Sequence, residues 1–213
     1  MFKKTVMVLA LLGAAASAHA EQYTFINEGF NNVPGLTGQG WKVVNNASGG
    51  VTPGWVQGDQ TNFTAHTGAP ESYASSLWSD AGAGQSLASW LITSAFSTEF
   101  DTQVSFWARG GGDATYLDQL TYGLVNSAGD ISSLITTATV TALDDWTRYT
   151  FTIAGQGAGS TARFALGHVG DADAANIVGI DDLRVAQVPE PSTWALAGVS
   201  LLGLMAARRR RAR

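Results

Sequence analysis

The stretch that decides the fold class is QVSFWAR, residues 103–109. In an extended chain, Val104, Phe106 and Ala108 would share one face, whereas Trp107 would point to the opposite side. This alternation is typical of a β-strand that is buried on one face and polar on the other. The stretch therefore predicts a strand whose apolar face packs against a second layer.

Similar short runs occur along the whole middle of the chain, separated by glycine, proline, asparagine and aspartate. No stretch shows an apolar period of about 3.6 residues, so we expect little helix. About eleven strands without room for crossover helices favour an all-β fold, an antiparallel jelly-roll sandwich rather than an immunoglobulin one. The expected strands are 23–30, 41–44, 55–57, 72–78, 88–93, 103–109, 117–125, 131–137, 146–153, 162–169 and 177–185.

The composition of this middle part, residues 21–187, excludes several functions. It contains five basic and sixteen acidic residues, a net charge of −11. Such a charge repels nucleic acid and anionic lipid, and suits either solubility or a divalent cation. The chain has no cysteine, which rules out disulfides, thiolate nucleophiles and zinc–thiolate sites.

The N-terminus has the pattern of a secretory signal peptide. Lys3 and Lys4 precede an apolar run, Val6–Ala16, and Ala18-His19-Ala20 fits the small-x-small cleavage pattern. The apolar run is too short for a permanent anchor across a bilayer of about 30 Å. We predict export through the Sec translocon and removal of residues 1–20.

The C-terminal residues 188–213 form a second unusual segment. Pro189-Glu190-Pro191 breaks the chain, Thr193–Ala207 is uncharged, and Arg208–Arg211 forms a cationic end. As a helix the uncharged run would be about 22 Å long, a short transmembrane helix. The positive-inside rule keeps the arginines cytoplasmic, so the body would face the periplasm. An ordinary tail anchor and a buried core helix are the alternatives.

This segment resembles the PEP-CTERM sorting signal of Gram-negative bacteria. Pro189, Glu190 and Pro191 match the recognition triplet, and Arg208, Arg209, Arg210 and Arg211 match the cationic end. The resemblance implies that an exosortase removes the helix and passes the protein from the inner membrane to the cell surface or extracellular matrix. It also implies an association with exopolysaccharide.

Several short motifs follow one another along residues 23–187. They are Phe25-x-x-Glu28-x-Phe30, Gly40-Trp41-x-Val43-Val44, Gly54-Trp55-x-Gln57-Gly58, Ser89-Trp90-Leu91-Ile92-Thr93, residues 104–109, Asp145-Trp146-Thr147 and Gly179-Ile180-Asp181-Asp182-Leu183. In this order they resemble the choice-of-anchor J domain. The opening and closing strands also resemble those of MAM domains and jelly-roll carbohydrate-binding modules. The resemblance implies a location and a fold rather than an activity.

Glu28, Asp181 and Asp182 are candidate ligands of a structural calcium ion. They lie in the first and last expected strands, which usually neighbour each other in jelly rolls, and carboxylates are the oxygen ligands that calcium prefers. Asp181 should point inward, because it shares a face with apolar residues. The alternative is that Asp181 accepts hydrogen bonds from the backbone or an arginine.

The aromatic residues offer a candidate carbohydrate surface. We interpret Trp41, Trp90 and Trp146 as core residues. The rings that remain as candidates for stacking on sugars are Trp55, Trp78, Trp107 and Tyr116.

No pattern in the sequence favours catalysis. The mature chain has two histidines, His66 and His168, which we interpret as solvated, and it lacks a Gly-x-Ser-x-Gly elbow. Asp181 and Asp182 are adjacent, so their side chains should diverge on a strand. We predict a non-catalytic, surface-anchored module associated with polysaccharide, the envelope matrix or adhesion. A lectin-like module and a carbohydrate-active enzyme are the alternatives.

Overall fold

The computed structural model describes residues 23–112 and 115–188. Thr24–Gln187 form one compact unit that contains its own hydrophobic core. The predicted signal peptide, the predicted transmembrane helix and the sorting residues Pro189–Pro191 and Arg208–Arg211 lie outside the described residues. Within the described part, no helix is long and apolar enough to cross a membrane.

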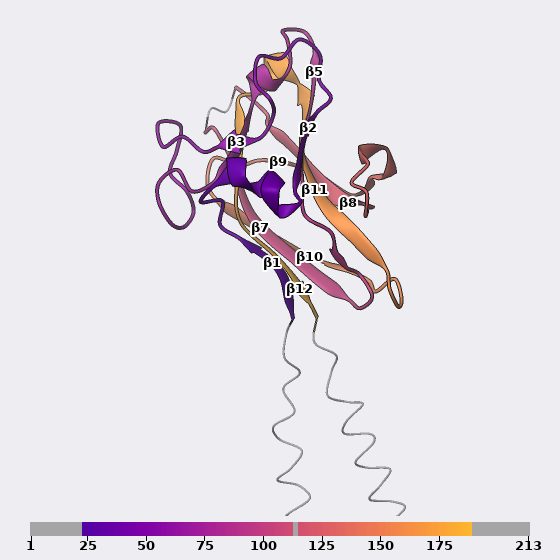
Figure 1. Cartoon of the computed structure of the whole chain (residues 1–213). Helices are drawn as coiled ribbons and strands as arrows, with labels where there is room; N and C mark the ends of the chain where they lie inside the picture. Colours follow the sequence, from indigo (N-terminus) through magenta and orange to yellow (C-terminus); the bar gives the residue numbers. More distant parts are fainter. Residues whose placement is uncertain (1–22, 113–114, 189–213) are drawn as a thin grey trace, which may run out of the picture. The chain divides into compact units, whose positions relative to one another are not determined.

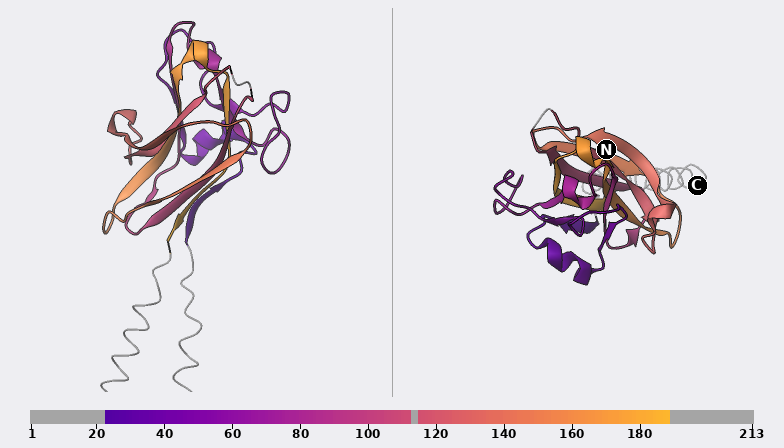
Figure 2. Two further views of the ribbon diagram at one scale, coloured as in Figure 1. Left: turned by 180° about the vertical axis from the view of Figure 1, so that it is seen from behind. Right: turned by 90° about the horizontal axis from the view of Figure 1, so that it is seen from above.

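Twelve strands of the described chain form two antiparallel sheets of six strands each (Figures 1 and 2). The β12 sheet has the order β10 (Thr147–Ile153), β7 (Thr102–Gly110), β12 (Ile177–Gln187), β4 (Ala74–Leu77) and β3 (Val56–Gln57), with β1 (Thr24–Glu28) paired to β12. The β11 sheet has the order β2 (Lys42–Asn45), β5 (Ser86–Ile92), β11 (Thr161–Asp171), β8 (Gln119–Asn126) and β9 (Ile135–Thr141), with β6 (Phe96–Ser97) paired to β11. The predicted antiparallel sandwich is confirmed.

The main core lies between the two sheets, and β7 shows why the sequence forms it. Phe106 is fully buried, and its ring centroid lies 5.2 Å from that of Tyr122, 5.4 Å from that of Tyr149 and 5.9 Å from that of Phe164. Burying one such side chain contributes roughly 1.5–3 kcal/mol to folding. Trp107, the next residue, lies on the outer face, as the alternation predicts.

A second apolar cluster covers the outer face of the β12 sheet. The 58–72 loop, between β3 and β4, places Phe63 on this face, where it packs with Tyr73 and Ile177. The Phe63 ring stacks on the Tyr73 ring at a centroid distance of 4.7 Å. A Cβ atom at Gly179 of β12 would come within 2.6 Å of the Phe63 ring, so only glycine leaves room for the ring there. This contact fixes the loop to the sheet.

Strand β12 is interrupted by a bulge in its middle. Its pairing with β7 shifts register between Asp181 and Arg184, and Asp182 has a φ of 47°, in the left-handed region. A bulge turns a side chain away from the regular alternation. Asp182 consequently points to the same loop as Asp181, which makes the prediction of diverging carboxylates wrong.

Short 3₁₀ helices connect the strands within the described residues: η2 (Val33–Gln39), η3 (Trp78–Asp80), η4 (Ile131–Ser133) and η5 (Ala172–Ala174). The strand expected at 131–137 begins only after η4, as β9, and ends later, at Thr141. The two-residue strand β6 carries too little alternation to be recognised in the sequence.

Candidate functional site

One end of the sandwich brings together two exposed aromatic rings from distant parts of the sequence. Trp78 in η3 is 49% exposed and Tyr116, between β7 and β8, is 39% exposed. Both line a hollow of about 260 Å³, together with Asp173 and Asn176 near η5. The backbone N–H of Trp78 donates to the carbonyl of Asn176 over 2.8 Å. Because η3 and η5 lie side by side (Figure 1), the Trp78 backbone is fixed.

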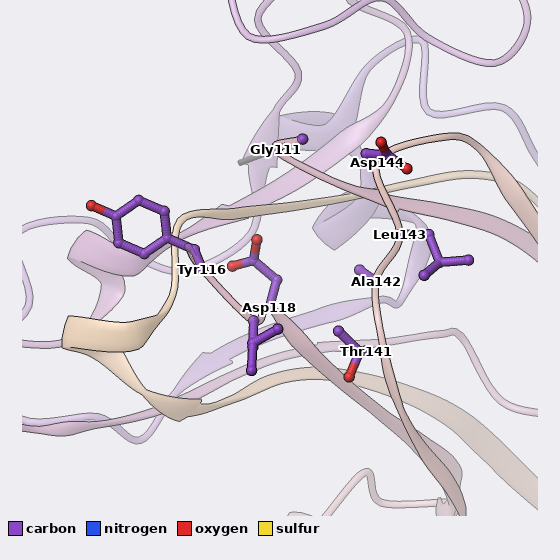
Figure 3. A pocket seen from close by; sticks show the side chains of 9 residues that line it. Gly111, Tyr116, Asp118, Thr141, Ala142, Leu143 and Asp144 are labelled. Atoms are coloured by element: carbon purple, nitrogen blue, oxygen red, sulfur yellow. The ribbon is translucent and has the colours of Figure 1, made fainter. Parts of the chain in front are cut away.

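A second hollow of about 300 Å³ adjoins the first and shares Tyr116 with it. Figure 3 shows Tyr116 on one side, Leu143 and Asp144 on the other, and the carboxylate of Asp118 between them. Among the described residues, neither hollow is lined by a lysine or an arginine. The lining therefore combines aromatic and apolar surface with side chains that accept hydrogen bonds.

A chain of buried polar side chains lies close to both hollows. The Asp80 carboxylate accepts hydrogen bonds from the hydroxyls of Thr52 and Ser76. His168 Nδ1 lies 3.0 Å from Ser76 Oγ, and its Nε2 lies 3.3 Å from Asp118 Oδ1. The second distance suits an ion pair, although Nε2 is outside hydrogen-bond geometry. Asp80 and His168 are 0% exposed, so the network is buried and approaches the surface only at Asp118, which lines the second hollow and is 3% exposed.

This buried network connects the three segments that form the hollows. Ser76 and Asp80 flank Trp78 in the sequence, and Asp118 follows Tyr116 by two residues. The same Asp118 oxygen that faces His168 accepts the backbone N–H of Asn176 over 2.7 Å. The network is therefore bonded to each element that carries a lining residue of the first hollow.

Ser76, His168 and Asp118 have the residue types of a hydrolase triad, but their hydrogen bonds do not suit one. All three are buried, and the single hydroxyl proton of Ser76 is donated to Asp80. With that proton directed to Asp80, Ser76 Oγ presents only its lone pairs to His168 Nδ1. A general base needs the reverse arrangement, with the imidazole accepting the serine proton.

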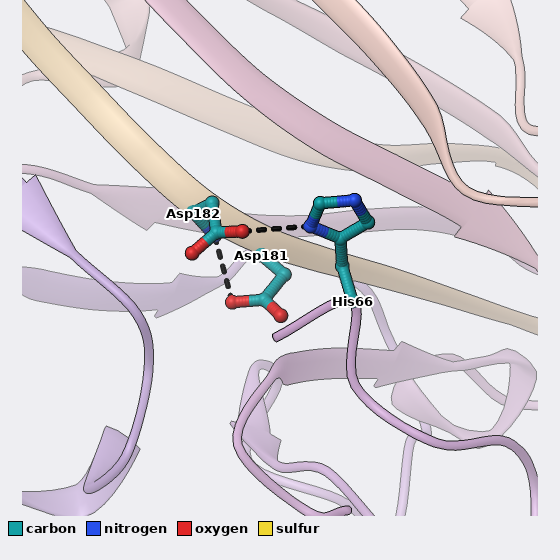
Figure 4. A group of neighbouring side chains, drawn as sticks. All are labelled: His66, Asp181 and Asp182. Atoms are coloured by element: carbon teal, nitrogen blue, oxygen red, sulfur yellow. Dashed lines mark hydrogen bonds and ion pairs between the residues drawn. The ribbon is translucent and has the colours of Figure 1, made fainter. Parts of the chain in front are cut away.

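A separate cluster joins the 58–72 loop to the bulge of β12 (Figure 4). His66 Nδ1 lies 2.7 Å from Asp182 Oδ2, and the Thr67 hydroxyl donates to Asp182 Oδ1 over 2.8 Å. The Thr67 N–H donates to Asp181 Oδ2 over 3.1 Å, and the Asp182 N–H donates to Asp181 Oδ1 over 2.7 Å. Each of the four carboxylate oxygens therefore has a partner within the protein.

The side chains of this cluster differ from the set that the sequence predicts for calcium. Calcium takes about 6–8 oxygen ligands, whereas the group within ligand distance consists of one imidazole, His66, and the carboxylates of Asp181 and Asp182. Glu28 accepts the Phe30 N–H over 2.8 Å and is not a member of that group. The contacts of Asp181 match the alternative, a buried carboxylate bonded to backbone amides. Calcium binding stays a sequence-based prediction.

A family model of the PEP-CTERM protein-sorting motif matches residues 187–211. The chain ends in a PEP-CTERM sorting motif. The motif implies export and membrane-associated sorting in a Gram-negative bacterium, with processing by an exosortase. The match begins at Gln187, the last residue of β12.

Solved structures share the fold of the body. The K3 and K1 cleaved adhesin domains of Lys-gingipain from Porphyromonas gingivalis superpose with TM-scores of 0.61 and 0.59, at 16% and 18% identity. The superpositions cover 78% and 75% of this chain and 99% and 96% of those domains. A carbohydrate-binding module, TmCBM61 in complex with β-1,4-galactotriose, has a TM-score of 0.47 at 14% identity, over 76% of this chain and 99% of the module. No curated protein matches the chain.

The structure separates the four aromatic candidates. Trp78 and Tyr116 are both exposed and line the same hollow. The prediction that Trp55 is an available ring is wrong, because it is 3% exposed and its indole N–H donates to the Ser89 carbonyl. Trp107 faces outward as predicted, but His66 stacks on its ring at a centroid distance of 3.8 Å.

Several residues of the site were missed in the sequence. The interpretation of His168 as solvated is wrong, because the strand β11 buries it completely. His66 is partly exposed and bonded to Asp182 rather than free. A signal for His168 was present, since it lies in the apolar run of 162–169, where a polar residue needs buried partners. No local pattern identifies Asp118 and Asn176, which come together only in the folded chain.

The free energy of unfolding of residues 21–187 should depend on the protonation of Asp181. Burial raises the pKa of Asp181 to about 6, against the backbone amides of Thr67 and Asp182, which lower it. The pKa of Asp181 is therefore higher in the folded than in the unfolded protein. Its contribution to the free energy of unfolding is complete below about pH 4 and is lost as the pH rises through 6. Asp181→Asn, which does not titrate, should therefore gain stability relative to the wild type between pH 4 and pH 7.

The measurement is the melting temperature of both proteins across this pH range, with Asp182→Asn as the matched control. The melting temperature of Asp181→Asn minus that of the wild type should rise with pH, whatever this difference is at pH 4. A difference that stays constant would show that Asp181 keeps an ordinary pKa.

Proposed function

We propose that this chain is an exported, surface-displayed and non-catalytic jelly-roll module that associates with extracellular polysaccharide. The observation that carries the proposal is the sorting motif at residues 187–211, which follows directly on the last strand of a compact sandwich. The sandwich is thus the cargo of the sorting step. Its route would run through the Sec translocon to an inner-membrane intermediate with a periplasmic body, and then to the surface.

The polar groups of the body support a binding role over a catalytic one. In the described part of the chain, the Ser76, His168 and Asp118 arrangement is buried and bonded in the wrong sense for proton abstraction. The carboxylates of Asp181 and Asp182 are occupied by the 58–72 loop. The sequence patterns of residues 23–187 further support membership of the choice-of-anchor J family.

The first test follows the sorting motif. In a Gram-negative host that has an exosortase, the full chain should be recovered at the cell surface or in the matrix. A chain ending at Gln187 should be lost to the periplasm or medium, and Glu190→Ala should accumulate uncleaved in the inner membrane. Recovery of the truncated chain at the surface in wild-type amounts would contradict the proposal.

The second part of the test concerns polysaccharide. Residues 21–187 should be retained on polysaccharide extracted from the producing cells, without release of reducing sugar. Release of sugar ends would make the module an enzyme and overturn the non-catalytic role. The same assay with EDTA and with added calcium checks the calcium prediction, since loss of retention with EDTA would show a metal-dependent site.

A further inference from the structure

In the described part of the chain, the two adjoining hollows combine several features of a ligand site. We infer that they form one continuous site for an uncharged polysaccharide, in which Trp78 and Tyr116 stack on sugar rings and carboxylates accept hydrogen bonds from hydroxyls. The inference rests on the proposed function and specifies where, and to which class of polysaccharide, the module binds. The groups that carry it come from η3, from the segment 116–118 before β8 and from the η5 region.

The exposure of Trp78 and Tyr116 is the first argument. Large aromatic side chains contribute most when buried, and rings left half in solvent beside each other commonly mark binding surfaces. Both rings line the same concave hollow rather than an open, flat surface. A pyranose presents faces of C–H groups that pack on an aromatic ring, so two rings in one hollow suit a saccharide.

The polar lining is the second argument. Asp144 and Asp173 are the exposed carboxylates of the lining, and Asp118, which is 3% exposed, lies beneath them. Ionised carboxylates only accept hydrogen bonds. A ligand that satisfies them must donate, as sugar hydroxyls do. The described lining residues include no lysine or arginine to pair with an anion, so uronate, phosphate and sulfate groups would be repelled. The site is therefore selective for an uncharged chain over an acidic one.

The shared position of Tyr116 is the third argument. It lines both hollows, so a ligand that stacks on Trp78 can continue past Tyr116 towards Leu143 and Asp144 (Figure 3). The volumes of about 260 and 300 Å³ lie near the lower limit of small-molecule sites. Because a ligand that fills both hollows must pass Tyr116, the two together suit consecutive sugar units of a longer chain.

The buried network gives this site a rigid base. Ser76 and Asp80, which flank Trp78 in the sequence, are hydrogen-bonded to each other. The backbone N–H of Asn176 donates to Asp118. Asp173 also accepts the Gly84 N–H through both of its carboxylate oxygens, each over 3.1 Å. A lining whose backbone is held in advance loses less conformational entropy when a ligand binds. His168, at the centre of the network, is a positioning residue in this scheme.

The test measures binding of residues 21–187, whose core is self-contained, to defined polysaccharides by affinity electrophoresis and calorimetry. The uncharged probes are xylan, β-1,4-galactan and dextran, and the acidic probe is polygalacturonate. At least one uncharged probe should bind, and polygalacturonate should bind at least tenfold more weakly. Trp78→Ala and Tyr116→Ala should each weaken binding to the uncharged probe at least tenfold, with unchanged circular dichroism and melting temperature.

Phe100→Ala is the matched control, because Phe100 is a 43% exposed aromatic residue outside both hollows. Its binding should equal that of the wild type, and binding to the uncharged probe should persist in 0.5 M NaCl. Equal binding of polygalacturonate, or binding that both variants keep, would overturn the inference. If both variants still retain polysaccharide from the producing cells, the proposed function stands while this site is refuted. If the wild type retains none, the proposed function itself fails.

Discussion

Replacing His168 with alanine is expected to lower the free energy of unfolding by about 3–5 kcal/mol. His168 is fully buried, and its ring nitrogens lie 3.0 Å from Ser76 Oγ and 3.3 Å from Asp118 Oδ1. The substitution leaves a cavity and removes the neighbour of a carboxylate that is itself buried. Urea denaturation of residues 21–187, followed by tryptophan fluorescence, measures the change.

His66→Ala is the control for this prediction, because His66 also faces a carboxylate but is partly exposed. Removing a partly exposed pair and the ring that stacks on Trp107 costs less than emptying a fully buried position, about 1–2 kcal/mol. If the two histidine variants had equal stability, the buried network would contribute nothing beyond a surface pair. The proposed polysaccharide site would then lose the rigid base that the Ser76, His168 and Asp118 contacts give it.

Replacing Gly179 with alanine is expected to destabilise the protein by about 1–3 kcal/mol, as overpacking does elsewhere. The new Cβ would lie 2.6 and 2.8 Å from Phe63 ring carbons and 3.1 Å from a Tyr73 ring carbon. Tyr73 cannot give way easily, because its hydroxyl donates to the Asp59 carbonyl over 2.7 Å. The Phe63 ring must therefore move, and the 58–72 loop with it.

Displacement of the loop should also be visible at His66, which the loop places on Trp107 and against Asp182. We expect a red shift of tryptophan fluorescence in the native Gly179→Ala protein, as Trp107 becomes more exposed. Gly38→Ala is the control, since no atom lies within 4 Å of its Cβ position and its φ is not in the left-handed region. It should stay within about 0.5 kcal/mol of the wild type. Equal melting curves for both variants would mean that the position of the loop does not depend on the space that Gly179 leaves for the Phe63 ring.

The strands of this fold and the bulge in β12 differ in how well the sequence predicts them. The strand around Phe106 is predicted from its alternation alone, because burial on one face requires apolar residues at every second position. The bulge at Asp182 breaks that rule within a strand of otherwise regular pattern. It depends on Thr67 and His66, more than a hundred residues away in the chain, which bond to the two carboxylates.

The candidate polysaccharide site shows the same division. The sequence offers Trp55, Trp78 and Tyr116 alike as candidate rings. Trp78 and Tyr116 are exposed, whereas Trp55, which follows Gly54, is buried. Local composition reports the flexibility of the backbone around a ring, whereas the exposure of the ring depends on which sheet lies over it. Sequence alone could not distinguish these cases.

The sequence by itself determined the class of fold and the sorting motif of the protein. Alternating apolar residues set the two-sheet sandwich, and the sorting motif is a local pattern that is recognised as a linear segment. Only the tertiary structure decided which aromatic rings share a hollow and which polar groups are buried beneath them. The physical reason is that strand formation depends on neighbours one and two residues away, whereas a site forms where connections between different strands converge in space.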